Sequence, residues 1–293
     1  MRIALLYATV VLIWGSTWSA IPFQLGVVAE EVSVAYRFAL GSLALFIYAL
    51  VSGRRLTIPR KDYGMVVVQG TLMFSANYLF TYYAINFVAS GLVAVVFSLI
   101  VISNAFLERV FFKRSLEPRL LAGSLFGVAG VACLFWPEVN SLDAGDQSMY
   151  GMMIAVIAVL FASIGNMAAI STTSRGLPVV AVNAHGMAWG ALASVIVATL
   201  AGREFLLPME SGYLLSLLYL AIFGSAVAFG AYLALLRTVG SARAAYTAIL
   251  FPPVALLFST VLEDYQWTTY GAFGIALIIA GNWLALTRIK GNE

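Results

Sequence analysis

The sequence predicts an all-α integral membrane protein with ten transmembrane helices, arranged as two inverted five-helix repeats. Of the 293 residues, 62% are hydrophobic and only 10% are charged, whereas soluble domains have about 45–50% apolar and about 25% charged residues. A soluble fold of this length could not bury so much apolar surface, so lipid must be the solvent. The apolar runs, the distribution of charge and an internal repeat all favour this architecture.

Ten stretches reach the length of about 20 mainly apolar residues that a bilayer span needs. In chain order they are 3–25, 32–51, 63–85, 90–112, 119–136, 149–171, 179–201, 212–236, 242–262 and 268–288. The first is longer than the core of a secretory signal and lacks a small-residue cleavage pattern, so we interpret it as a membrane helix. Most connections are short, which predicts antiparallel neighbours.

Charge predicts the orientation of these helices. Fourteen of the sixteen basic residues fall on one side of the predicted bundle: Arg2, Arg54, Arg55, Arg60, Lys61, Arg109, Lys113, Arg114, Arg119, Arg175, Arg237, Arg243, Arg288 and Lys290. The positive-inside rule assigns that side to the cytoplasm, and both termini with it. The basic pI then reflects membrane topology, and no nucleic-acid partner is implied.

A shift of 151 residues superimposes the fourth and fifth spans on the ninth and tenth. The aligned pairs include Ser90 with Ser241, Gly123 with Gly274, and Gly130 with Gly281. Because each half has an odd number of helices, the halves must enter the membrane from opposite sides, as in many secondary transporters. We expect three parts: a first repeat at 1–137, an extracytoplasmic connection at 138–148 and a second repeat at 149–293. Gly123 and Gly127 form a GxxxG pattern that suits either internal packing or a dimer face.

The stretch WGSTWSAIPF, Trp14 to Phe23, resembles the first helix of the EamA-type drug/metabolite transporter superfamily. The stretch from Ala242 to Leu286 resembles the same family in its small residues, mid-helix prolines, acidic residue and glycine-rich last helix. The resemblance extends over the chain and implies two five-helix halves in the cell inner membrane. It suggests the branch of YddG-like exporters of amino acids and methyl viologen. One departure is that the fourth span has Val101 and Ile102 where the ninth span has its two prolines, so the two halves are not equally broken.

Those adjacent prolines, Pro252 and Pro253, interrupt the ninth predicted span about halfway. Proline lacks an N–H and clashes with the preceding turn, so carbonyls around Ala248 and Ile249 lose their donors. In lipid such a break is tolerated next to protein or a water-filled cavity. The prolines could therefore open a substrate-binding carbonyl site, or they could form a packing kink without ligand contact.

Aromatic and polar side chains recur at helical spacing in the first and third spans. Trp14 shares a helix face with Trp18, and Ser75 shares one with Tyr78 and Tyr82. Buried tyrosine hydroxyls need partners, so we expect these residues to bind substrate, with helix packing as the alternative.

Further candidate substrate-binding residues are Asn104, Ser163, Asn166, His185 and Tyr246. For each of them, hydrogen bonding between helices is the alternative. His185 could bind a substrate carboxylate or respond to pH, and a neutral, fully hydrogen-bonded histidine fits equally well.

Two charged residues near the outer side are candidate gating groups. Arg37 lies one to two turns below the predicted outer surface. It could snorkel towards Glu30 or Glu31, or it could take part in gating or carboxylate attraction. Glu263 lies near the outer end of the ninth span. No aspartate or glutamate falls mid-span, so the sequence indicates no acidic proton relay.

The sequence contains no P-loop, no metal-ligand cluster and no nucleophile next to a base. We therefore expect neither an enzyme nor a metal or cofactor site, and the single cysteine, Cys133, excludes a disulfide within the chain. The candidate site consists of hydroxyls, amides, carbonyls and aromatic rings. Together with the resemblance to YddG-like exporters, it predicts an alternating-access carrier that works by facilitated transport or by exchange. It would export neutral amino acids, hydrophobic or aromatic ones and threonine or methionine, and drugs such as methyl viologen. A sugar or purine carrier and proton-coupled drug efflux are the alternatives, and no obligate protein partner is implied.

Overall fold

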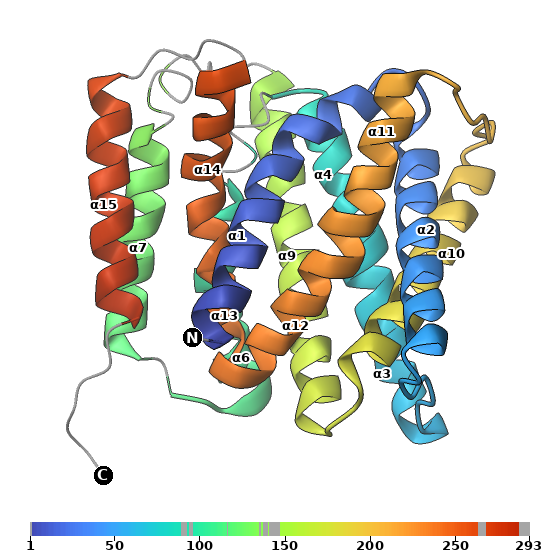
Figure 1. The fold of residues 1–293 in the computed structure, drawn as a ribbon. Helices are drawn as coiled ribbons and strands as arrows, with labels where there is room; N and C mark the ends of the chain where they lie inside the picture. Colours follow the sequence, from blue (N-terminus) through green and yellow to red (C-terminus); the bar gives the residue numbers. More distant parts are fainter. Residues whose placement is uncertain are drawn as a thin grey trace.

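The computed structural model describes residues 2–88, 96–115, 117–134, 147–262 and 268–286, with the single residues 93, 136 and 140. Every element in these ranges is helical. In Figure 1 the helices stand side by side and run alternately up and down. Each of the ten predicted ranges overlaps one of these helical stretches, whereas the predicted connection 138–148 lies almost wholly outside the described residues.

The elements follow one another with short connections. Up to Leu134 they are α1 (Arg2–Ala20), the 3-10 helix η1 (Ile21–Gln24), α2 (Glu30–Val51), α3 (Arg60–Thr71), the π-helix η2 (Leu72–Ala76), α4 (Asn77–Ile85), α6 (Ile100–Phe112) and α7 (Pro118–Leu134). From Gln147 they are α9 (Gln147–Ser174), α10 (Val179–Leu200), α11 (Ser211–Tyr219), the π-helix η3 (Leu220–Val227), α12 (Ala228–Val239), α13 (Ser241–Ala245), α14 (Thr247–Leu262) and α15 (Thr269–Leu286). Proline sits just before α3 and α10 and at the start of α7, where its missing N–H is not needed.

Five of these helices are long and apolar enough to cross a membrane. They are Ile3–Gln24, Glu30–Val51, Met149–Ser174, Val179–Leu200 and Ser211–Val239; Pro118–Leu134 and Thr269–Gly281 are shorter apolar helices. On α2 the outward residues Leu43, Ile47 and Leu50 are 54%, 52% and 74% exposed, while Phe38 and Leu45 are buried. A soluble protein rarely exposes so many large apolar side chains, and in a bilayer they would face the acyl chains.

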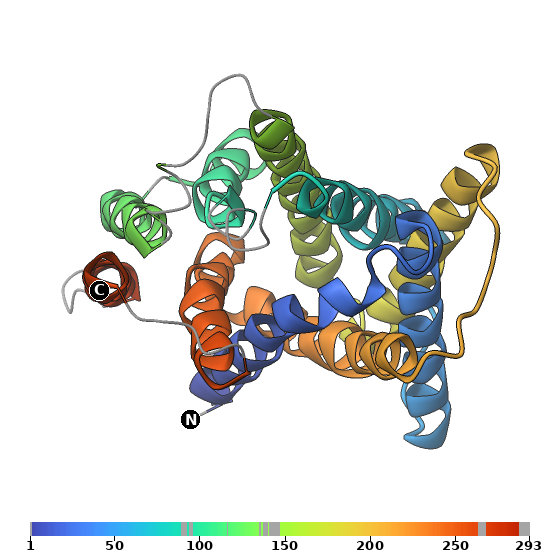
Figure 2. The ribbon, with the colours of Figure 1, turned by 90° about the horizontal axis from the view of Figure 1, so that it is seen from above.

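Helices α7 and α15 pack against each other at one edge of the molecule (Figures 1 and 2). A Cβ on Gly130 would come within 2.7 Å of the carbonyl oxygen of Gly274, and one on Gly281 within 2.6 Å of the carbonyl oxygen of Gly123. Only glycine lets two backbones approach this closely. The GxxxG pattern at Gly123 and Gly127 therefore serves packing within the chain.

Two π-helices widen long helices that are otherwise regular. η2 joins α3 to α4, and η3 joins α11 to α12. In η3 the hydroxyl of Ser225 donates to the carbonyl oxygen of Leu220, five residues earlier. Such wide turns are frequent at functional sites, and both lie in the part of the bundle that contains the cavity described below.

The proline pair lies inside α14, which stays helical from Thr247 to Leu262. The interruption expected at the prolines occurs instead at Tyr246, between α13 and α14. Because Pro252 and Pro253 withhold donors from carbonyls one turn earlier, the first turn of α14 is held by fewer hydrogen bonds. This places the break before the prolines.

Candidate binding cavity

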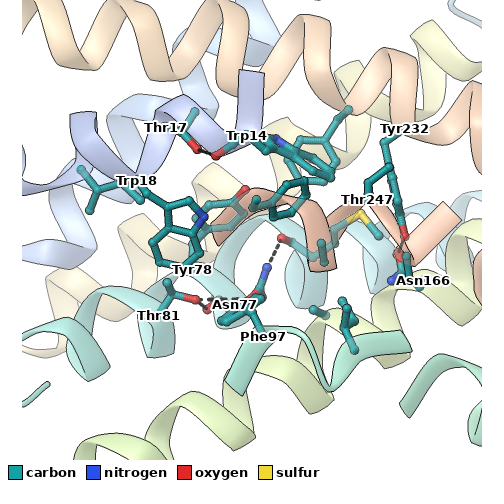
Figure 3. Close-up of a pocket in the computed structure, with 18 of the residues that line it drawn as sticks. Trp14, Thr17, Trp18, Asn77, Tyr78, Thr81, Phe97, Asn166, Tyr232 and Thr247 are labelled. Atoms are coloured by element: carbon teal, nitrogen blue, oxygen red, sulfur yellow. Dashed lines mark hydrogen bonds between the residues drawn. The ribbon is translucent and has the colours of Figure 1, made fainter. Parts of the chain in front are cut away.

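A cavity of about 100 Å³ lies where helices from both halves of the chain meet (Figure 3). Its lining residues are Trp14, Thr17, Trp18, Ile21, Arg37, Met73, Asn77, Tyr78, Thr81, Phe97, Ile100, Ala162, Asn166, Phe229, Tyr232, Ala245, Thr247, Ala248 and Phe251. Aromatic rings and uncharged polar groups predominate. Among the described residues that line it, the only charged side chain is that of Arg37, and none is acidic.

Trp14 forms the centre of an aromatic cluster. Its ring centroid lies 4.7 Å from that of Phe229, 5.2 Å from that of Tyr232 and 5.6 Å from that of Phe251. Its indole N–H donates to the carbonyl oxygen of Gly224 at 2.9 Å, inside the π-helix η3. The indole thus has its polar atom satisfied and presents apolar surface to the cavity.

Arg37 is only 1% exposed and points into the bundle. Its Nε donates to the hydroxyl of Ser225 at 3.0 Å, and its guanidinium carbon lies 4.6 Å from the centroid of the Tyr78 ring and 5.4 Å from that of Phe38. Its Nη1 has no hydrogen-bond partner among the described residues.

The expectation that Arg37 snorkels towards Glu30 or Glu31 is wrong. Glu31 accepts hydrogen bonds from Tyr83 and Arg203, and Glu30 accepts one from Asn86. Ring faces and a serine hydroxyl hold the guanidinium inside instead, and its gating role stays a prediction.

A polar group occupies another part of the cavity wall. The Tyr232 hydroxyl donates to Oδ1 of Asn166 at 3.2 Å, and Nδ2 of Asn166 donates to Oδ1 of Asn104 at 3.4 Å. Figure 3 places Asn166, Tyr232 and Thr247 on the side away from Trp18 and Thr81. Asn104 does not line the cavity but orients Asn166, and its own Nδ2 has no partner in the described part of the chain.

Four predicted substrate-binding residues, Trp14, Trp18, Tyr78 and Asn166, line the cavity together with the predicted gating residue Arg37. The predicted stripe on the third span is not continuous. Ser75 lies within η2 and hydrogen bonds to Ser194 at 2.8 Å, because the wide turn changes the direction of the side chains around it. Tyr82 is fully buried and donates to Oε1 of Gln24 at 2.9 Å.

The remaining predicted binding residues lie outside the described lining. Ser163 is buried without a hydrogen-bond partner for its hydroxyl among the residues described, and Tyr246 donates towards Leu120 and Ser124 of α7. Neither Pro252 nor Pro253 lines the cavity, although Ala248, whose carbonyl Pro252 leaves without its usual helical donor, does. Glu263 lies outside the described residues.

His185 belongs to a separate cluster, not to the cavity. Its Nε2 lies 3.1 Å from the carbonyl oxygen of Leu56, and its Nδ1 lies 3.2 Å from the hydroxyl of Tyr63. A carbonyl can only accept, so Nε2 carries a hydrogen. Both ring nitrogens of His185 thus have partners within the chain.

Several lining residues were not predicted. Thr17 lies between the two predicted tryptophans. Asn77 and Thr81 lie on either side of Tyr78 and are four residues apart, so they share a helix face with each other. A search of the residues next to the predicted ones would have found all three. Phe229 and Phe251 have no such signal, because a phenylalanine in an apolar span looks the same whether it faces lipid or a cavity.

The profile of the EamA-like transporter family matches residues 1–136 and 149–287. The chain belongs to this family. Its members are transporters, which agrees with an all-helical chain that has several apolar, membrane-length helices. The family expected from the sequence is therefore confirmed, and transport of a small molecule, not catalysis, is the activity that this family indicates.

Similar proteins extend over nearly the whole chain. The uncharacterized inner membrane transporter YedA of Escherichia coli is 27% identical, covering 93% of this chain and 89% of YedA. A probable amino-acid metabolite efflux pump of the same species is 24% identical, covering 97% of this chain and 94% of the pump. A solved crystal structure of another protein has a TM-score of 0.80 at 20% identity, covering 97% of this chain and 96% of the other. At this identity the likeness shows the fold alone.

Proposed function

We propose that this protein exports neutral amino acids, hydrophobic and aromatic ones above all, across the inner membrane. The observation that carries the proposal is the cavity lined by rings, hydroxyls and amides from both halves of the chain. Such a lining accommodates an apolar side chain and hydrogen bonds a small polar group. The similarity to a probable amino-acid metabolite efflux pump favours the same substrate class.

The proposed architecture is ten spans in two inverted five-helix repeats, at 1–137 and 149–293. The family profile matches two stretches with nearly these bounds. The contacts between α7 and α15 also support a two-fold relation, because the 151-residue shift converts the Gly123–Gly281 contact into the Gly274–Gly130 contact. The π-helices at Leu72–Ala76 and Leu220–Val227 fall in corresponding spans of the two halves.

We place both termini in the cytoplasm. The first residues of α1 and the last residues of α15 lie at the same end of the molecule (Figure 1). The connection from α2 to α3, with Arg54 and Arg55, and the one from α9 to α10, with Arg175, lie at that end as well. The positive-inside rule makes it the cytoplasmic end.

Alternating access is supported by polar contacts that join the two halves at both ends of the bundle. At the proposed cytoplasmic end, Ser241 donates its backbone N–H to Glu108 at 3.0 Å, and Arg243 pairs with Glu117 at 2.6 Å. At the opposite end, Arg203 pairs with Glu31 at 3.4 Å. We infer that these contacts separate in turn as the halves rock about the cavity.

The same lining favours a facilitative or exchange mechanism. No aspartate or glutamate is among the described residues around the cavity, so a buried acidic proton relay has no support there. The guanidinium of Arg37 also disfavours dications such as methyl viologen, which we therefore leave out of the proposal.

Counterflow with the purified protein in liposomes tests the function. Vesicles loaded with unlabelled phenylalanine, methionine or threonine should accumulate the labelled amino acid without a pH gradient, whereas protein-free vesicles should not. Absence of counterflow for all three would reject amino acids as substrates. Accumulation that requires an imposed proton gradient would reject the facilitative mechanism.

A further inference from the structure

Arg37 carries a buried charge for which the described residues provide no counter-ion. The four ion pairs among the described residues involve other arginines, Arg114, Arg175, Arg203 and Arg243, whose side chains are partly exposed. Taking a charge out of water is costly unless an opposite charge compensates it. The faces of Tyr78 and Phe38 offset part of this cost, but they leave Nη1 without an acceptor.

The surroundings of Arg37 hold it ready for an anion. Ser225 accepts from Nε, and the aromatic faces fix the plane of the guanidinium. The same side chain lines the cavity with Trp18 and Tyr78. An arginine that lines a cavity and keeps a buried Nη1 without an acceptor suits a carboxylate, which a guanidinium binds through charge-assisted hydrogen bonds.

We propose that Arg37 is an anion-binding subsite that recognises the carboxylate of the transported molecule, and that the cavity selects monocarboxylates with an apolar or aromatic body. Trp14, Trp18 and Phe97 receive that body. An α-ammonium group is not required, because the described lining holds no carboxylate to pair with it. The inference deepens the proposed function, since it treats the cavity as the substrate site and names the group that the site recognises.

Binding to the purified, full-length protein tests this independently of transport. The probes are 3-phenylpropionate, which has the carboxylate alone, 2-phenylethylamine, which has the ammonium alone, and 3-phenylpropanol, which has neither. Titration calorimetry and thermal unfolding in a buffer of low ionic strength, free of carboxylates and chloride, should show binding and stabilisation by 3-phenylpropionate and none by the other two probes. Sodium chloride, added separately, reports whether an inorganic anion occupies the site.

Variants of Arg37 show whether this residue is the one that binds 3-phenylpropionate. Arg37→Gln should weaken 3-phenylpropionate binding by roughly 10- to 100-fold, as expected for the loss of charge-assisted hydrogen bonds. Arg37→Lys keeps the charge but loses the planar fork, so it should bind with intermediate affinity; it also serves if the glutamine variant does not fold. Arg55→Gln, on the exposed connection between α2 and α3, is the matched control and should bind like the unaltered protein.

Three results would overturn the proposal: equal binding of 2-phenylethylamine, unchanged 3-phenylpropionate binding by Arg37→Gln, or saturation by chloride that leaves no effect of 3-phenylpropionate. Failure of amino-acid counterflow together with carboxylate binding at Arg37 would reject the proposed substrates and keep the subsite. Normal counterflow together with unchanged 3-phenylpropionate binding by Arg37→Gln would keep the proposed substrates and reject the subsite.

Discussion

Tyr78 and Tyr82 lie one turn apart on α4, yet their surroundings differ. Tyr78 lines the cavity and lies beneath the guanidinium of Arg37. Tyr82 is fully buried and does not line the cavity; its hydroxyl donates to Gln24 and lies near Arg37. Sequence spacing puts both on one helix face, but only the neighbouring helices determine which of the two can contact a ligand.

We expect substitutions at the two tyrosines to separate binding from stability. Tyr78→Ala removes a ring from the cavity and from beneath Arg37, so it should change the relative counterflow rates of phenylalanine and threonine. Tyr82→Phe removes one buried hydrogen bond and should lower stability by about 1 kcal/mol, with a smaller effect on that preference than Tyr78→Ala. Counterflow rates and thermal unfolding of both variants measure these effects. A shifted preference in Tyr82→Phe alone would contradict the assignment.

Helices α7 and α15 pack with their backbones in direct contact. Their backbones touch at Gly130 with Gly274 and at Gly123 with Gly281. Their glycines were visible as a repeated pattern in the sequence, but the pattern does not reveal its partner. The structure identifies the partner as the other half of the same chain.

Gly274→Ala should therefore destabilise the protein. Its Cβ would come within 2.6 Å of the carbonyl oxygen of Gly130 and 2.7 Å of the backbone nitrogen of Leu134, so the helices must separate, at a cost of about 1–3 kcal/mol. The matched control is Gly64→Ala on α3, where an added Cβ meets nothing within 4 Å and alanine's higher helix propensity should maintain or raise stability. The apparent melting temperature in detergent compares the two. Equal melting temperatures would show that this contact does not limit stability.

The π-helices are the feature that sequence reasoning missed at this scale. An apolar run such as Leu72–Ala76 is compatible with either an α- or a π-turn, because both keep the same residues in a continuous helix. The π-turn of η2 decides the direction of Ser75, which hydrogen bonds to Ser194. The π-turn of η3 contains Gly224, which accepts from Trp14, and Ser225, which accepts from Arg37.

At the scale of the whole molecule, the orientation in the membrane can be tested with reporter fusions. Alkaline phosphatase folds only outside the cytoplasm, so a fusion after Glu204, in the connection from α10 to α11, should be active. A fusion after Arg175, in the connection from α9 to α10, should be inactive, and green fluorescent protein at the C-terminus should fluoresce. The reverse pattern would invert the proposed topology.

The sequence by itself determined that this chain is helical, that it belongs in a membrane and which stretches form its helices. These properties depend on composition and on hydrophobicity along a run of neighbouring residues, which need no knowledge of the fold. It also pointed to Trp14, Trp18 and Tyr78 as cavity residues, because aromatic and polar side chains at helical spacing stand out in an apolar span.

Only the tertiary structure decided which polar residues meet. Arg37 faces inward because Ser225 and the rings of Phe38 and Tyr78 hold it there. These four residues come from α2, α4 and η3, which are far apart in the sequence. His185 is satisfied by Tyr63 and Leu56, away from the cavity. Such contacts depend on the rotation of each helix about its axis, and a single wide turn changes that rotation without altering the hydrophobic pattern.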